Sequence, residues 1–166
     1  LSDVKINHNS YKDLTIFYMD VVNFTAISEK QSPENVANLL NDLFGICDVI
    51  TRENHGDIDK FIGDVIMATY IDANDAISSA KKILAALKIL NKERRTQNET
   101  EINIRIGINT GNVMQVEIGT QDRKDFTVIG DTVNTASRIE SISEPNSIFI
   151  SAATYLKLTT HSEFEF

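Results

Sequence analysis

Two aspartates occupy positions where the chain could bind divalent metal ions. Asp20 directly follows an apolar run that predicts a buried strand, and Asp64 lies in a Gly63-Asp64 pair between two further apolar runs. Taken singly, each is typical of a turn or cap residue. If the two strands pair, the carboxylates repel each other unless a cation lies between them. Because Mg²⁺ prefers such oxygens and keeps room for substrate phosphates, the pair then predicts two-metal phosphoryl transfer.

Four polar side chains could act on a phosphorylated substrate near these acids. Lys60 lies four residues before Asp64 and shares its face if that strand stays regular. Arg105 lies on the polar face of an alternating strand, where a solvent-facing position is an equally ordinary interpretation. Asn134 and Arg138 are spaced i and i+4 on a predicted helix and project together. That pair could orient a ribose and stabilise phosphate charge, or simply form a polar helix face.

The hydrophobic pattern predicts strands and helices that could position these residues. Ser32-Pro33 starts a helix that Gly56 can end, and Gly130-Asp131 opens another, with Asp131 as its cap. Thr110 to Asn112 is expected to turn the chain into a returning strand. This order predicts an α+β fold, a ferredoxin-like βαββαβ core sheet with helices packed on one face. The strands are expected at 14–19, 58–62, 65–70, 102–108, 113–118, 126–129 and 147–150, with helices also at 74–95 and 152–158.

Length and composition indicate one globular domain. The chain has 166 residues, of which we expect 1–12 to be an N-terminal connector and 13–166 the folded domain. The formal net charge of -8 disfavours nucleic acid as a partner. Cys47, the single cysteine, lies on an apolar helical stripe and is expected to be a buried, inert thiol. No apolar run approaches the roughly 18 residues of a membrane span. Since the first residue is not Met, an upstream sensor or membrane region is expected in a longer protein.

Four short strings, in one order along the chain, resemble those of class III adenylate and guanylate cyclases. Together they cover the chain from about residue 14 to residue 155. The strings are Phe17-Tyr18-Met19-Asp20-Val21-Val22-Asn23-Phe24-Thr25, Lys60-Phe61-Ile62-Gly63-Asp64, Ile104-Arg105-Ile106-Gly107-Ile108-Asn109-Thr110-Gly111 and Phe126-Thr127-Val128-Ile129-Gly130-Asp131-Thr132-Val133-Asn134-Thr135-Ala136-Ser137-Arg138. One such string is weak evidence, but four in register identify a class III cyclase homology domain.

The resemblance implies a role for each candidate residue. Asp20 and Asp64, helped by the Val21 carbonyl, would bind two Mg²⁺ or Mn²⁺ ions. The ribose 3′-oxygen would attack the α-phosphate in line and release pyrophosphate. In that reaction Arg105 would contact the terminal phosphates, Asn134 would orient the ribose, and Arg138 would neutralise charge at the α-phosphate.

The same resemblance implies a substrate and an assembly. Lys60 would donate to a ring nitrogen of adenine, and Thr127 would accept from the 6-amino group. Guanylate cyclases of this family typically carry Glu and Cys there, so ATP is the expected substrate and adenylate cyclase the expected activity. The chain would act as a cytoplasmic catalytic domain in a head-to-tail homodimer with two shared sites. One copy would supply Asp20, Asp64 and Arg105, and the other Lys60, Thr127, Asn134 and Arg138.

Several departures and alternatives accompany this interpretation. Asn23 stands where glycine is usual, and Val116-Glu117 replaces a common Gly-Asn near the expected dimer arm. The C-terminal hairpin, which usually supplies another phosphate-binding Lys, is expected to be truncated at Phe166. The alternative functions are a guanylate cyclase, a degenerate cyclase-homology module for dimerisation or sensing, and a palm-like nucleotidyltransferase. Against the last, the chain has no Gly-Gly-Asp/Glu-Glu-Phe string.

Overall fold

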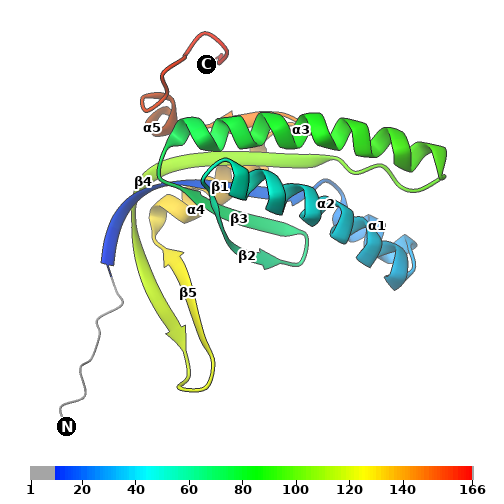
Figure 1. Cartoon of the computed structure of the whole chain (residues 1–166), viewed down its shortest axis with the longest axis horizontal. Helices are drawn as coiled ribbons and strands as arrows, with labels where there is room; N and C mark the ends of the chain where they lie inside the picture. The colour runs from blue at the N-terminus through cyan, green and yellow to red at the C-terminus, as the bar shows by residue number, and fades with distance from the viewer. Residues whose placement is uncertain (1–9, 166) are drawn as a thin grey trace.

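The fold is a six-stranded sheet with helices on both faces, seen in a computed structural model that describes residues 10–165 (Figure 1). Residues 10–12, expected in a connector, instead begin the first strand, and the rest of that connector lies outside the described residues. None of the helices in the described part is long and apolar enough to cross a membrane. The strands are β1 (Ser10–Val21), β2 (Asp57–Ile62), β3 (Val65–Tyr70), β4 (Ile104–Gly119), β5 (Lys124–Ile129) and β6 (Ile148–Ile150). The helices are α1 (Phe24–Lys30), α2 (Pro33–Glu53), α3 (Ala73–Thr96), α4 (Asp131–Ile142) and α5 (Ala152–Tyr155).

The predicted ferredoxin-like core is confirmed by the order of the strands. The sheet runs β2-β3-β1-β4-β5, and β6 pairs parallel to β4. Its first four strands are antiparallel neighbours connected by α2, the β2–β3 hairpin and α3, which is a βαββαβ unit. The two helices of this unit pack on one face, as expected (Figure 1). α4, which follows the unit, packs on the opposite face, so not every helix shares one side.

β1 is buried on both faces because each face has its own apolar layer. Phe17 and Met19 belong to the main core under α2 and α3. Leu14 and Ile16 point the other way, into a smaller core that includes Ala136 of α4. Since successive strand residues alternate between faces, this explains the unbroken apolar run that the sequence shows here.

The expected turn at Thr110 to Asn112 is wrong, because β4, which is 16 residues long, runs through these positions without a turn. β1 extends to Ser10 and pairs with this stretch, placing Leu14 opposite Gly111 and Asp13 opposite Asn112. The Thr110 hydroxyl bonds to Thr15 Oγ1 at 2.8 Å and to Thr154 Oγ1 at 2.9 Å. The turn-forming residues are therefore satisfied inside the sheet, and the chain reverses later, between Gly119 and Lys124.

Three helix ends also differ from expectation. α1, which the sequence did not predict, has Asn23 as its N-cap residue. Asn23 is in the left-handed region, with a φ of 58°. α2 begins after the expected Ser32 cap but ends at Glu53, with His55 rather than Gly56 in the left-handed region. Gly56 is needed for a different reason, because a Cβ there would lie 2.4 Å from the Tyr70 ring. α4 is capped by the backbone of Gly130, at φ 137°, and not by the Asp131 side chain.

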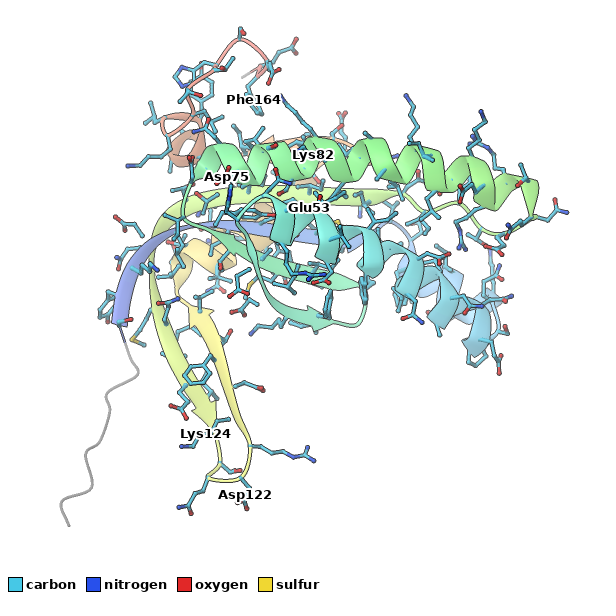
Figure 2. The ribbon with its side chains drawn as sticks, viewed as in Figure 1. Glu53, Asp75, Lys82, Asp122, Lys124 and Phe164 are labelled. Carbon is cyan, nitrogen blue, oxygen red and sulfur yellow. The ribbon has the colours of Figure 1, made fainter. Side chains whose placement is uncertain are left out.

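β4 and β5 extend past the body of the molecule as a two-stranded arm (Figure 1). Asp122 and Lys124 lie at its far end (Figure 2). Ile118 and Phe126 on the arm are 51% and 64% exposed, so this hairpin carries apolar surface away from the core. The expected departure at Val116-Glu117 lies on the arm, where the two residues pair with Thr127 and Phe126.

The prediction of a buried Cys47 is confirmed, and it makes the thiol unreactive in the native protein. Burial raises the pKa of Cys47 from 9.0 to about 12. Above pH 9 the unfolded chain loses this proton while the native state keeps it, so this group lowers the free energy of unfolding as the pH rises.

We expect iodoacetamide at pH 9 to alkylate Cys47 stoichiometrically in urea and to leave the native protein unmodified, as measured by mass spectrometry. Rapid alkylation without urea would contradict this placement.

Candidate active site

The two candidate metal-binding aspartates meet at one end of β1. Asp20 is the second-to-last residue of β1, and Asp64 lies in the turn between β2 and β3. The backbone N–H of Val21 donates to Asp64 Oδ2 at 3.0 Å, which orients that carboxylate beside Asp20. Burial raises the pKa of Asp64; the Val21 hydrogen bond opposes this, and the charge of Asp20 adds to it. The adjacency on which the sequence argument depended is therefore present.

Arg105 and Glu140 complete this cluster from β4 and α4. Arg105 is the cross-strand partner of Asp20 in the β1–β4 pair. Glu140 is only 4% exposed, although it carries a carboxyl group. Burial, followed by the hydrogen bond and the negative charge of Asp20, raises the pKa of Glu140 to about 8, and the charge of Arg105 opposes this rise. The raised pKa favours the protonated form of Glu140 beside Asp20.

Gly107 allows α4 to come close enough to bring Glu140 into the cluster. A Cβ on Gly107 would lie 2.3 Å from the Glu140 backbone nitrogen and 2.7 Å from the Ala136 carbonyl oxygen. Both neighbours are helix backbone, so they cannot move aside as a flexible side chain could. The glycine thus sets the separation of α4 and β4 at the point where Glu140 turns toward Asp20 and Arg105.

The residues of this cluster fit a divalent cation. Asp20 Oδ1 and Glu140 Oε1 are buried oxygens without a hydrogen-bond donor among the described residues, and buried polar atoms of this kind need a partner. Within residues 10–165, no group of three or more His, Cys, Asp or Glu side chains is arranged to hold a metal by itself. Water, backbone or substrate oxygens would therefore have to complete the coordination, as is usual for Mg²⁺.

A second cluster brings Lys60 and Thr127 together around Asp59. Thr127 Oγ1 donates to Asp59 Oδ2 at 2.7 Å, and Lys60 Nζ lies 3.6 Å from the same oxygen. β2 and β5 are at opposite edges of the sheet, so this contact joins strands that do not pair. The strand does not stay regular at Lys60, because the register shifts between Ile58 and Lys60 and leaves Asp59 as a bulge residue. A bulge re-aims the side chains on either side of it, which explains how the Lys60 ammonium comes near the carboxylate of its neighbour Asp59.

Asn134 and Arg138 lie on the outer side of α4, as their spacing predicted. Both are exposed, and Arg138 Nη2 donates to Thr135 Oγ1 at 3.0 Å and reaches Asp131 Oδ1 at 3.4 Å. In the part of the chain that the structure describes, no hydrogen bond or ion pair connects them with Asp20 or Asp64. Arg138 and Glu140 are two residues apart, or about 200° around the helix, so they face nearly opposite directions.

Sequence reasoning missed Asp59, Glu140 and the close approach at Gly107. Glu140 continues the inner stripe of α4 that Val133 and Ala136 begin, and a charged residue on such a stripe is a recognisable sign of a buried polar site. Asp59 gave no comparable sign, because its position depends on a bulge and on a contact between distant strands.

Comparisons with known proteins agree on one family. The family described as "Adenylate and Guanylate cyclase catalytic domain" matches residues 6–166. An adenylate cyclase of Anabaena cylindrica is 35% identical over 87% of this chain, and the receptor-type guanylate cyclase gcy-20 of Caenorhabditis elegans is 37% identical over 93%. The chain spans only 30% and 14% of the lengths of these two relatives. The solved adenylyl cyclase CyaB of P. aeruginosa superposes with a TM-score of 0.85 at 37% identity, covering 89% of this chain and 81% of that one.

The close packing at Gly107 can be tested by adding one methyl group. We expect Gly107→Ala to lower the free energy of unfolding by about 2 kcal/mol, because the new Cβ must displace helix backbone. The matched control is Gly45→Ala on α2, where a Cβ would have no neighbour within 4 Å. It should raise stability by about 0.5–1 kcal/mol through helix propensity. Urea denaturation measures both, and equal effects of the two substitutions would refute the close-approach account.

Proposed function

We propose that this chain, which belongs to the adenylate and guanylate cyclase catalytic domain family, converts ATP to 3′,5′-cyclic AMP and pyrophosphate. The observation that carries the proposal is the meeting of Asp20 and Asp64 at Val21, with one buried Asp20 oxygen lacking a donor in the described part of the chain. In this reaction the ribose 3′-oxygen forms a bond to the α-phosphorus. The bond between that phosphorus and the leaving pyrophosphate breaks, and the hydroxyl proton passes to solvent.

Asp20 and Asp64, with the Val21 carbonyl, would hold two Mg²⁺ or Mn²⁺ ions. When bound, such ions lower the pKa of an attacking hydroxyl and neutralise triphosphate charge. Arg105 would contribute a further cation toward the terminal phosphates, and its Nε has no acceptor among the described residues. Asn134 would orient the ribose. Arg138 would neutralise charge that develops at the α-phosphate, where a fixed donor is most effective.

The preference for ATP over GTP rests on Lys60 and Thr127. Relatives of both substrate classes match this chain with similar identity, so family membership leaves the base open. Lys60 can only donate hydrogen bonds, which suits an unprotonated ring nitrogen of adenine. Thr127 can accept from the 6-amino group. Their shared contact with Asp59 supports the proposal, because it places a donor and an acceptor side by side.

We also propose that two copies of the chain share each site. Glu140 on the inner side of α4 contacts Asp20, whereas Arg138 on the outer side is exposed and, among residues 10–165, its side chain bonds to Thr135 and Asp131 of the same helix. One copy therefore does not bring Arg138 to its own aspartates. In a two-fold pair, the Asp20, Asp64 and Arg105 of one copy would face the Asn134 and Arg138 of the other, giving two equivalent sites.

The activity is tested by incubating the purified chain with Mn²⁺ and either ATP or GTP, and quantifying cyclic nucleotide and pyrophosphate. We expect cyclic AMP as the main product. Asp20→Ala and Asp64→Ala should each reduce its rate by at least about 100-fold, since either change removes a metal ligand. Asp48→Ala, which removes an exposed carboxylate on α2, should retain the rate. Cyclic GMP as the main product would favour the guanylate cyclase alternative, and no product from folded protein would favour a non-catalytic module.

Shared sites predict that two inactive variants restore activity when they are paired. In co-expressed Asp20→Ala and Arg138→Ala chains, a mixed pair has one site with both defects and one site with none. Random pairing should then recover roughly a quarter of the parental rate. The matched control combines Asp20→Ala with Asp64→Ala, which damage the same half and leave no intact site. Equal activity in the two mixtures would exclude the proposed division of residues.

A further inference from the structure

Asp59 is placed between the two residues that we propose to read the base. It is the bulge residue of β2, and its side chain is only 9% exposed. One of its oxygens, Oδ2, accepts from Thr127 Oγ1 at 2.7 Å and lies 3.6 Å from Lys60 Nζ. A single carboxylate therefore contacts both members of the pair, from strands at opposite edges of the sheet.

The hydrogen-bonding capacity of threonine makes this contact informative. A threonine hydroxyl has one proton to donate and can accept through its oxygen, so alone it tolerates either a donor or an acceptor on a ligand. An ionised carboxylate only accepts. When Thr127 gives its proton to Asp59, its oxygen can only accept from a ligand.

We propose that Asp59 is a specificity-determining residue that selects adenine over guanine by fixing the direction of the Thr127 hydroxyl proton. The inference rests on the proposed cyclase function and concerns the base subsite of the same site. Asp59 acts through Thr127 and Lys60, so it is a positioning residue.

The pattern that results matches adenine and opposes guanine. Thr127 presents an acceptor, which pairs with the 6-amino donor of adenine and repels the 6-oxo acceptor of guanine. Lys60 presents a donor, which pairs with the unprotonated N1 of adenine and meets an N–H at the same position of guanine. A site with fixed polar partners discriminates strongly, because the wrong ligand leaves those groups unpaired.

The surroundings of Asp59 are compatible with the ionised form that this mechanism needs. On balance the pKa of Asp59 is raised, chiefly by burial, and the Thr127 hydrogen bond and the positive charge of Lys60 oppose this rise. The neighbouring ammonium group favours the carboxylate over the acid at neutral pH.

The test replaces Asp59 by asparagine, whose amide group can donate to Thr127 and so release the hydroxyl proton toward guanine. The measured quantity is the ratio of kcat/KM for ATP to kcat/KM for GTP. We expect Asp59→Asn to lower this ratio by about tenfold, which is the effect of one hydrogen bond, mainly through KM. Asp57→Asn is the matched control, because it removes an exposed carboxylate from the same strand and should leave the ratio unchanged.

A second background separates the proposed path from simple loss of packing. In Thr127→Val there is no hydroxyl to orient, so adding Asp59→Asn should change the ratio by less than about twofold. An equal change in both backgrounds, or an unchanged ratio in Asp59→Asn alone, would overturn the inference and leave the cyclase function standing.

Binding without turnover keeps the two proposals distinguishable. Isothermal titration calorimetry with 3′-deoxy-ATP and 3′-deoxy-GTP measures base preference in the absence of the attacking hydroxyl. If the parent forms no cyclic nucleotide, the proposed function fails, and the ratio of the two Kd values still tests Asp59. We expect Asp59→Asn to shift that ratio toward guanine by about tenfold. No binding of either nucleotide to the parent, or no shift in the variant, would overturn the role of Asp59.

Discussion

The pairing of β1 along both of its edges fixes the candidate active site. Its antiparallel register with β4 places Asp20 opposite Arg105, and its neighbour β3 starts from the turn that carries Asp64. Because strand side chains alternate, a shift of one residue in this register would turn Asp20 into the apolar core and Met19 out of it. The two cores on either side of β1 strongly oppose such a shift. The stability of the sheet and the geometry of the acids therefore depend on the same hydrogen-bond ladder.

Electrostatics then determines what the site can hold. Asp20, Asp64 and Glu140 gather beside Arg105, so the carboxyl groups of this partly buried cluster outnumber its cation. Without a metal, the protein limits this excess by favouring the protonated form of Glu140. α4 contributes to the balance on one side only, since its outer side carries Asn134 and Arg138 away from the cluster. With Glu140 on its inner side and Asn134 and Arg138 on its outer side, α4 suits the two-copy arrangement that we propose.

Sequence patterns were informative where local chemistry decides the structure. Alternation and helical spacing gave the βαββαβ core, and the Gly63-Asp64 pair gave the β2–β3 hairpin with Gly63 at a φ of 57°. They were wrong where distant strands decide. Thr110 to Asn112 has the composition of a turn, yet the extended β1 holds it in a strand. For the site, the candidate residues were predictable, and the meeting of Asp20 with Asp64 was expected only if their strands paired. The inner stripe of α4 marks Glu140 as a buried polar residue, but its approach to Asp20 depends on the close contact at Gly107. The position of Asp59 depends on a bulge, which no local pattern encodes.

The arm formed by β4 and β5 has a mechanical consequence. Thr127 lies on β5 only three positions from Lys124, where the arm begins to turn, and its hydroxyl reaches across to β2. That hydrogen bond connects β5 with β2, which lie at the two ends of the strand order in the open sheet. A second molecule that binds the exposed apolar surface of the arm would therefore contact the strand that carries Thr127. Under the proposed function, the six residues of β5 would connect assembly with the choice of base.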